Sequence, residues 1–326
     1  MIRRLVSCML AVALSGGFQG VVAQAVQSTR QVQLGLMLVD LTEVNGAEQT
    51  ISADILMAAR WNDPELKGRY PEARSVGLDD VWHPTLLIYN QRSVSESLPR
   101  EVVVQPDGTV GYAQRFTGTF SSPMNLRDFP LDSQEFYVWV VSPQRLGSPA
   151  ALTPMEDLAT YSVDRLSVSD WTVEPARLEE ASFQAAPGAP ANPGIKLSFV
   201  AHRKTTYYVI QVLIPLVAIV MMAYAVFWIA PTVIPTRVGV VVTTMLTLIA
   251  YRFMLANLVP RLSYLTRFDW FMLGATVIVS LTLFAMAGTA YLVSRDREAL
   301  VRRIDRVGRV TYPIVFVAYS LIVWLA

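Results

Sequence analysis

The sequence predicts a β plus membrane-α protein, in which an extracellular, immunoglobulin-like β-sandwich is followed by a four-helix transmembrane bundle. Three observations support this fold class. Of 326 residues, 53% are hydrophobic and 16% are charged, with a mean hydropathy of +0.38, whereas soluble globular proteins average about 25% charged residues. The charge is divided, because residues 26–204 carry 15 Lys and Arg against 22 Asp and Glu, and residues 205–326 carry 10 against 4. Finally, the acidic half alternates in short runs, while the basic half contains long uncharged runs.

The first 25 residues are predicted to be a secretory signal peptide. Arg3 and Arg4 precede an apolar run over residues 5–14, which is too short to span a bilayer. A small-x-small cleavage pattern follows at residues 23–25, with an N-terminal membrane anchor as the alternative interpretation. The single cysteine, Cys8, lies within this segment, so the mature chain is expected to contain no disulfide.

Residues 26–204 are predicted to form the β-sandwich. Apolar and polar side chains alternate there in short runs, and several such runs separated by turn-forming residues are typical of this architecture. The runs cover residues 32–39, 51–61, 86–89, 101–104, 110–120, 135–141 and 195–201. Asp107-Gly108 stands between two of them and predicts a hairpin turn.

Four apolar segments in the second half are predicted to cross the membrane. They are residues 205–229, 237–258, 269–293 and 309–326. No charged residue occurs between Lys204 and Arg237, over 32 residues. The linker 294–308 is expected to be cytoplasmic because it holds five arginines, and positively charged loops stay inside. Four spans then place both termini on the extracytoplasmic side, in agreement with a signal peptide.

The second predicted span carries a distinctive stripe. At 100° per residue, one face collects Gly239, Thr243, Leu246, Ala250 and Phe253. Small residues and threonines commonly line contacts between membrane helices. The alternative is a pore lining, with a polar constriction at the cytoplasmic end and a hydrophobic gate above it. The helix by itself leaves both interpretations open.

The run Phe129-Pro130-Leu131-Asp132-Ser133-Gln134 is similar to an FPxDxQ signature. Together with Trp82-His83-Pro84, Tyr89-Asn90 and the four spans, it makes the whole mature chain resemble the pentameric ligand-gated ion channels, the Cys-loop receptor superfamily. In animal members two cysteines close this signature loop, whose ends here are Ser122 and Phe136, so the chain resembles the bacterial branch. The resemblance implies a homopentamer in a bacterial inner membrane, which contacts membrane lipid, binds a small-molecule or proton agonist and conducts ions.

By this resemblance the stripe becomes the lining of the pore, with Leu246 at the position of the family's central gate. The cytoplasmic mouth would be formed by Pro235, Thr236 and Arg237. This run resembles the anion-selective glycine and GABA receptors, and neither of the first two spans contains an acidic residue. An anion preference is therefore predicted, with a cation-selective channel of the same family as the alternative.

The resemblance also implies how the β-sandwich would act on the membrane helices. The residues implied in this coupling are Glu48, Phe129, Pro130, Asp132, Arg203 and Pro260. Asp132 is expected to pair with Arg203 directly before the first span, and Glu48 to complete an electrostatic cluster. Arginine and a carboxylate form geometrically specific contacts, which suits a two-position coupling. A static structural ion pair is the alternative.

The sequence indicates the ligand site less completely than it indicates the pore. Tyr89 matches the tyrosine of the aromatic cage found in amine-binding relatives, and Phe183 is the one aromatic residue of the loop expected to cap it. A further aromatic position falls at Pro143, so the cage is incomplete and a quaternary amine is disfavoured. Arg115, on the face expected to meet the neighbouring subunit, is a candidate partner for a carboxylate. The expected effector is a small anion, an apolar molecule or a proton.

For protons, histidine is the side chain whose ordinary titration lies nearest neutral pH. The chain has two histidines. His83 lies between a tryptophan and a proline and is interpreted as structural, whereas His202 borders the first span and is the candidate pH sensor. Carboxylates of the acidic half would serve only where burial raises their pKa values.

Other classes of protein receive little support. The mature chain has no cysteine, no phosphate-binding loop and no zinc-protease motif, so no enzyme activity, cofactor or metal site is predicted. No basic tract indicates nucleic acid. A non-conducting membrane sensor is the remaining alternative to a channel, but a sensor needs neither a polar stripe nor a gate.

Overall fold

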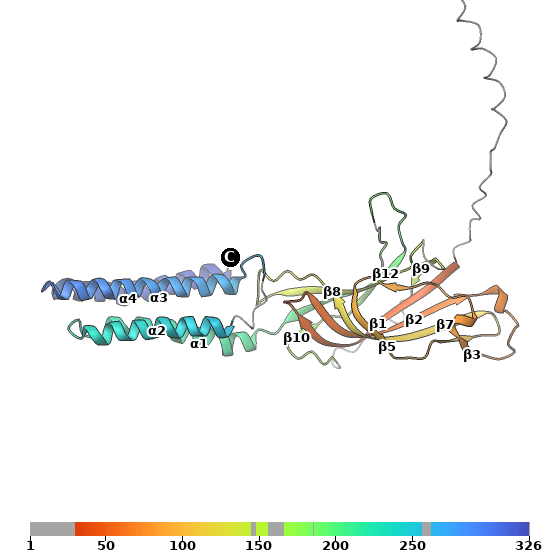
Figure 1. Ribbon diagram of the computed structural model, residues 1–326, viewed down its shortest axis with the longest axis horizontal. Helices are drawn as coiled ribbons and strands as arrows, with labels where there is room; N and C mark the ends of the chain where they lie inside the picture. Colours follow the sequence, from red (N-terminus) through yellow and green to blue (C-terminus); the bar gives the residue numbers. More distant parts are fainter. Residues whose placement is uncertain (1–29, 145–147, 156–165, 185, 256–261, 326) are drawn as a thin grey trace, which may run out of the picture.

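The computed structural model describes residues 30–144, 148–155, 166–184, 186–255 and 262–325. Within these residues a β-sandwich and a bundle of four long helices lie end to end (Figure 1). The predicted fold class is confirmed. The predicted signal peptide 1–25, with Cys8, and the predicted coupling residue Pro260 lie outside the described residues.

The sandwich consists of two sheets in the part of the chain that the structure describes. The larger contains β1 (Arg30–Asn45), β2 (Thr50–Asn62), β3 (Arg74–Gly77), β5 (Gln91–Glu96), β6 (Glu101–Val104), β7 (Thr109–Ser121) and β9 (Ala150–Pro154). The smaller contains β4 (Leu87–Ile88), β8 (Ser133–Val141), β10 (Trp171–Val173), β11 (Arg177–Glu180) and β12 (Gly194–Arg203). The strand order is β3-β6-β7-β2-β1-β9 with β5 on β7, and β10-β12-β8-β4 with β11 on β12.

The core lies between these sheets and follows from the alternation in the sequence. Side chains two residues apart point to the same face of a strand, so β1 buries Leu34, Leu36 and Leu38 in succession. In the opposite sheet β12 buries Leu197 and Phe199 in the same way. The residues between them point to the opposite face of each sheet, where Met37 of β1 is only partly buried.

The predicted hairpin turn is confirmed. Asp107-Gly108 joins β6 to β7, which pair antiparallel, and the Asp107 carboxylate accepts a hydrogen bond of 2.9 Å from the Thr109 N–H. Gly108 has φ +86°, and a Cβ there would lie 2.7 Å from the Asp63 carbonyl oxygen. Glycine is required at this position for both reasons.

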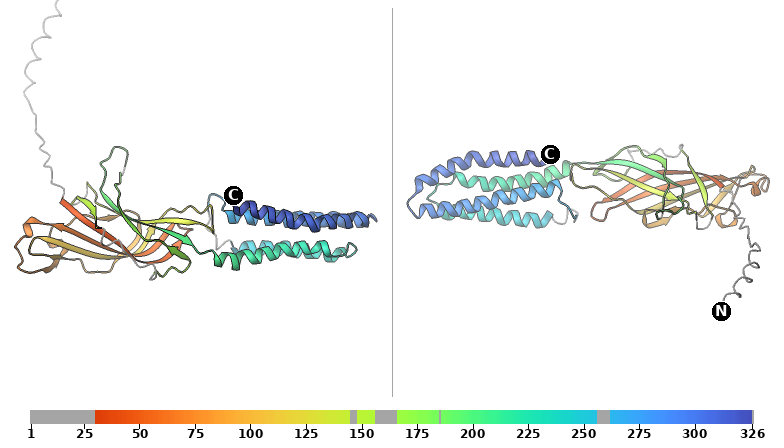
Figure 2. Two further views of the ribbon diagram at one scale, coloured as in Figure 1. Left: turned by 180° about the vertical axis from the view of Figure 1, so that it is seen from behind. Right: turned by 90° about the horizontal axis from the view of Figure 1, so that it is seen from above.

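Four helices form the bundle, and each is long and apolar enough to cross a membrane. They lie side by side in both views of Figure 2. The first crossing, Tyr208–Trp228, contains α1 (Ile214–Ala225) between a π-helical turn, Tyr208–Leu213, and a 3-10 turn, Val226–Trp228. The others are α2 (Ile234–Leu255), α3 (Arg267–Val293) and α4 (Glu298–Leu325).

The structure differs from the sequence prediction at the linker 294–308. Helix α4 begins at Glu298, so most of that segment is helical. Its charges do not interrupt the helix because Arg302 pairs with Glu298 one turn away at 3.1 Å. Val301 and Asp305, which lie one turn apart, are buried against the bundle. A segment that the sequence suggested to be a connection is therefore the first half of an amphipathic helix.

Candidate functional site

The stripe predicted on the second span faces away from the bundle of its own chain. All five of its residues, Gly239, Thr243, Leu246, Ala250 and Phe253, are exposed, Leu246 by 62% and Phe253 by 74%. The residues of α2 that are buried in the bundle lie on another face: Arg237, Val241, Thr244, Leu248 and Leu255. Helix α2 thus leaves one continuous face available to other subunits or to a central axis.

Arg237, predicted at the cytoplasmic mouth, does not lie on this face. Its side chain is buried and forms an ion pair with Asp305 of α4. Its Nε and Nη1 atoms have no hydrogen-bond partner among the described residues. The charge of Arg237 is therefore compensated within the subunit, and the exposed residues at this end of α2 are Pro235 and Thr236.

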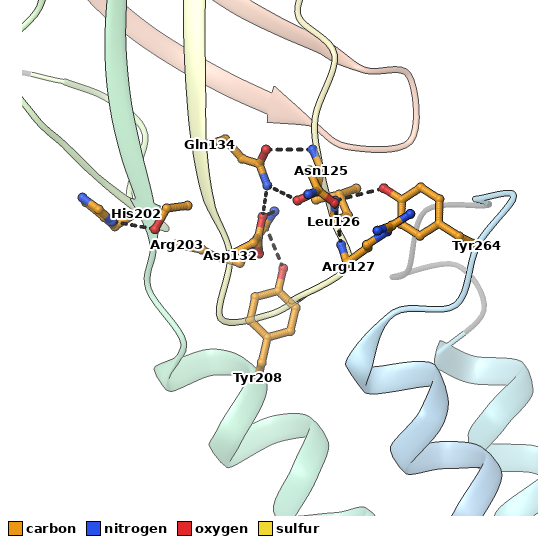
Figure 3. Close-up of polar contacts among 10 residues, drawn as sticks. Asn125, Leu126, Arg127, Asp132, Gln134, His202, Arg203, Tyr208 and Tyr264 are labelled. Carbon is orange, nitrogen blue, oxygen red and sulfur yellow. Dashed lines mark hydrogen bonds and ion pairs between the residues drawn. The ribbon is translucent and has the colours of Figure 1, made fainter. Parts of the chain in front are cut away.

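Asp132 and Arg203 form the predicted pair at the junction of sandwich and bundle (Figure 3). The Arg203 Nε donates to Asp132 Oδ1 at 2.8 Å and Nη2 to Oδ2 at 3.2 Å, so the contact is bidentate. The two side chains are 7% and 1% exposed. Gln134 donates a further hydrogen bond of 2.7 Å to Asp132. This buried pair joins the signature loop to the last residue of β12.

The same arginine is surrounded by aromatic rings from both halves of the chain. Its guanidinium lies 4.2 Å from the ring centroid of Trp171, 5.0 Å from that of Phe129 and 5.8 Å from that of Tyr208. Phe129 also packs edge-on against Tyr208 in the first crossing and against Phe268 in α3. Pro130 follows Phe129 and is buried beside it. Phe129 therefore carries the signature loop into the top of the membrane bundle.

Contacts with the segment that leads into α3 complete this junction. Tyr264, before α3, accepts a hydrogen bond of 3.0 Å from the Leu126 N–H (Figure 3). Arg267 donates through its backbone N–H to the Arg127 carbonyl at 2.8 Å and through Nε to Asp128 at 2.7 Å. The signature loop is thus held to α3 by both backbone and side-chain groups.

Glu48 was predicted to join this cluster, and the structure places it elsewhere. Glu48 is exposed, and its carboxylate forms no ion pair with a described residue. Its neighbour Gln49 makes the contact instead, since its side-chain oxygen accepts from the Met124 N–H and its carbonyl accepts from the Ser122 N–H at 2.9 Å. The β1–β2 turn therefore reaches the signature loop through neutral hydrogen bonds rather than through charge.

His202 lies on the outer side of β12, next to the buried pair. Its Nδ1 is 2.7 Å from the Ser133 hydroxyl of β8, and its Nε2 is 2.9 Å from a carboxylate oxygen of Glu174. The side chains of His202 and Glu174 are both half exposed. A proton on this imidazole would give a charged pair with Glu174, one residue away from Arg203.

The predicted ligand residues Tyr89 and Phe183 are brought together, and Trp139 of β8 joins them. The ring centroids are 4.1 Å apart for Tyr89 and Phe183, 5.3 Å for Tyr89 and Trp139, and 5.5 Å for Trp139 and Phe183. The Trp139 indole N–H donates to the Ala181 carbonyl at 3.1 Å. Pro143 occupies the position expected for a further aromatic residue, and Trp139 of β8 supplies the third ring instead. We call these three residues the aromatic cluster.

Arg115, the candidate partner for a carboxylate ligand, is already paired with Asp54 of the neighbouring strand β2. Partial burial alone would raise the pKa of Asp54, but hydrogen bonds from Thr117 and Arg115 and the charge of Arg115 outweigh it and lower that pKa. Asp54 is therefore ionised near neutral pH and compensates Arg115. Within one subunit no contact between described residues joins Arg115 to the aromatic cluster, and a meeting of the two across neighbouring subunits stays a prediction.

Two family models match the chain. Residues 21–142 match the neurotransmitter-gated ion-channel ligand binding domain, and residues 212–300 match the neurotransmitter-gated ion-channel transmembrane region. Together they cover 211 of the 326 residues. The chain belongs to the neurotransmitter-gated ion-channel family. This is a family of ligand-gated ion channels and not of enzymes, which confirms the prediction that the chain is not an enzyme.

Curated relatives agree with this assignment. The chain is 29% identical to a gamma-aminobutyric acid receptor subunit beta of Caenorhabditis elegans over 216 residues, covering 65% of this chain and 39% of the relative. It is 24% identical to gamma-aminobutyric acid receptor subunit alpha-2 of Bos taurus and of Homo sapiens over 285 residues, covering 82% of this chain and 61% of the relative. The chain thus matches between about two fifths and three fifths of the length of these relatives.

Proposed function

We propose that the chain forms a homopentameric ligand-gated ion channel whose pore is lined by five copies of α2. The observation that carries this proposal is the exposed stripe on that helix. A membrane helix normally buries its small and polar residues against neighbours, yet Gly239 and Thr243 lie on a face that the subunit leaves open. Assembly around an axis would enclose this face, with threonine rings inside and leucine and phenylalanine rings further out.

We further propose that the pore prefers anions. The resemblance of residues 235–239 to anion-selective receptors and the gamma-aminobutyric acid receptor subunits among the relatives both support this. Because Asp305 compensates Arg237, the preference would rest on the absence of acidic residues from α2 rather than on an exposed arginine. A glutamate ring, which would attract cations, cannot form from this helix.

Reversal potentials test this preference. When external NaCl is diluted with sucrose in oocytes expressing the chain, the reversal potential is expected to shift to more positive values, as chloride conduction requires. A negative shift would assign the pore to cations and overturn the proposed preference, while leaving the channel assignment in place. Thr236→Glu provides the matched comparison, since an acidic ring at the mouth should reduce the positive shift.

The effector is proposed to act at the extracellular aromatic cluster and to reach the pore through the signature loop. Tyr89 is exposed and packs against Phe183 and Trp139, and β8 runs from Trp139 to the signature loop. The proposed location is a bacterial inner membrane in contact with lipid, with both termini outside. The predicted signal peptide, the arginines near the start of α4 and the absence of cysteine from residues 26–326 support that location.

Protons are the first effector to test, because His202 lies beside the coupling pair. Replacing His202 by glutamine is expected to move the midpoint of proton activation toward acidic pH, since the remaining candidates are carboxylates. The measurement is current against external pH in oocytes, with His83→Gln as the control. An unchanged midpoint in the His202 variant would exclude His202 as the principal sensor.

Currents also distinguish the channel from a non-conducting sensor. With surface expression verified, a current evoked by external pH or by a small-molecule library supports the channel. If neither screen evokes a current, and a variant with a polar residue at the gate position Leu246 also conducts nothing, the non-conducting sensor would be favoured.

A further inference from the structure

One ion pair among the described residues links α2 to α4, and its acid is Asp305. The two helices are otherwise not packed closely together, because α2 packs mainly on α1 and α3, and α4 mainly on α3. Asp305 is also the one acidic side chain that is buried in the four described membrane crossings. An acid in an apolar bundle is unfavourable unless it is paired, and acids at such positions commonly serve function.

The partner of Asp305 is selected by the packing of the bundle. Helix α4 contains four arginines, and none of them pairs with Asp305 among the described contacts. The carboxylate instead pairs with Arg237, in the first turn of α2, and the side chains of Arg237 and Asp305 are 3% and 4% exposed. An arginine 68 residues away is therefore preferred over the arginines of the same helix.

The inward orientation of Arg237 depends on this acid. Its Nη2 donates to Asp305, whereas Nε and Nη1 have no hydrogen-bond partner among the described residues. A guanidinium cannot lose its proton in a protein, so Arg237 stays charged when its acid is removed. Its long stem lets the charged head reach nearby water. The exposed residues at this end of α2 are Pro235 and Thr236, directly before Arg237, so the freed guanidinium is expected to turn toward the mouth that they form.

We propose that Asp305 determines the ion selectivity of the channel, by holding the charge of Arg237 inside the subunit, although α4 does not carry the stripe. This inference rests on the proposed channel function. In a pentamer, five compensated pairs add no net charge to the mouth. Five uncompensated guanidinium groups would form a positive ring, which attracts anions and repels cations. Neutralising Asp305 therefore shifts the permeability toward anions, whichever ion the unmodified pore prefers.

The position of Arg237 is tested first, without current. Phenylglyoxal modifies guanidinium groups that water reaches, and peptide mass spectrometry of the purified full chain in detergent reports which arginines have reacted. Arg237 should be protected in the unmodified chain and should react about tenfold faster or more in Asp305→Asn, because its charge has lost the carboxylate. Asp305→Glu restores the charge and should restore most of the protection. Arg203, which is 7% exposed in another ion pair, should remain protected in each variant that keeps its fold.

Selectivity is tested in a Leu246→Ser background, which is expected to conduct without an effector because a polar side chain replaces the proposed gate. The chloride-to-sodium permeability ratio is obtained from the reversal potential as external NaCl is diluted with sucrose. Asp305→Asn should raise this ratio several-fold. The doubly neutral variant Arg237→Gln/Asp305→Asn removes both charges and should return the ratio to that of the background. A merely structural ion pair would give one ratio in all three chains.

Glu298→Gln is the matched control, since Glu298 is a partly exposed acid of the same helix and pairs with Arg302. This substitution should change neither the labelling of Arg237 nor the permeability ratio. Continued protection of Arg237 in Asp305→Asn, or a conducting Asp305→Asn chain with an unchanged ratio, would overturn the inference. If Asp305→Asn fails to fold, the doubly neutral variant decides. A ratio below that of the background would show that Arg237 already supplies its charge to the mouth, against the inference, and an equal ratio would support it.

Failure of this inference can be distinguished from failure of the proposed channel. A chain whose Arg237 becomes reactive in Asp305→Asn, but which conducts in no variant, would keep Asp305 as the residue that positions Arg237 and would lose the channel assignment. A chain that conducts with the same ratio in every variant would keep the channel and lose the role of Asp305 in selectivity.

Discussion

Replacing Asp132 by alanine is expected to abolish effector-evoked current. The substitution leaves the Arg203 guanidinium buried, among the rings of Trp171, Phe129 and Tyr208, without its bidentate acceptor. Removing one partner of a buried ion pair costs roughly 3–5 kcal/mol. Because Arg203 ends β12 directly before the first membrane crossing, the loss falls on the connection between sandwich and bundle.

The measurement is current per surface-expressed subunit, obtained by combining oocyte recording with surface labelling. Asp128→Ala is the matched control, because Asp128 belongs to the same loop and pairs with Arg267, but is half exposed. Exposed pairs contribute about 0–1 kcal/mol, so this variant should retain most of its current. Full currents from Asp132→Ala at normal surface density would show that the pair is not required for gating.

A folding defect in Asp132→Ala must be separated from a gating defect. Asp132→Asn keeps the shape of the side chain and can still accept a hydrogen bond from Arg203, but removes the charge. If Asp132→Asn reaches the surface and conducts weakly, charge is needed for coupling. If it conducts normally, the hydrogen bond alone is sufficient and the electrostatic account is wrong.

Replacing Leu246 by serine is expected to produce current without any effector. Leu246 lies in the middle of the exposed stripe, and five leucines at one level would close a pore by excluding water. A serine hydroxyl binds water and lowers the barrier to wetting, so the resting current should rise by about tenfold or more, equivalent to about 1.4 kcal/mol. The measurement is holding current before and after a pore blocker.

Leu281→Ser is the control for this substitution. Leu281 of α3 is 62% exposed, as Leu246 is, but lies on a different helix. A serine there should leave the resting current low. Equal leak from both variants would indicate general damage to the membrane bundle, and absence of leak from Leu246→Ser would place the gate elsewhere on α2.

Much of the architecture could be predicted because its signals are local. Alternation with a period of two defines the strands, and long uncharged runs define the membrane helices. The stripe on α2 needed only the helical repeat, since side chains three and four residues apart share a face whatever surrounds the helix. The partnership of Asp132 and Arg203 came from resemblance to a family, and the structure forms it at 2.8 Å.

The tertiary structure decided what residues far apart in the sequence do to one another. Trp139 joins Tyr89 because β4 pairs with β8, a register that no local pattern encodes. Arg237 turns from the mouth toward Asp305, 68 residues later, because a buried guanidinium in an apolar bundle requires a carboxylate. The charged segment before residue 309 is helical rather than a linker, and it contains Asp305, the partner of Arg237. Periodicity determines which face a side chain occupies, whereas packing between distant elements determines which partner that face meets.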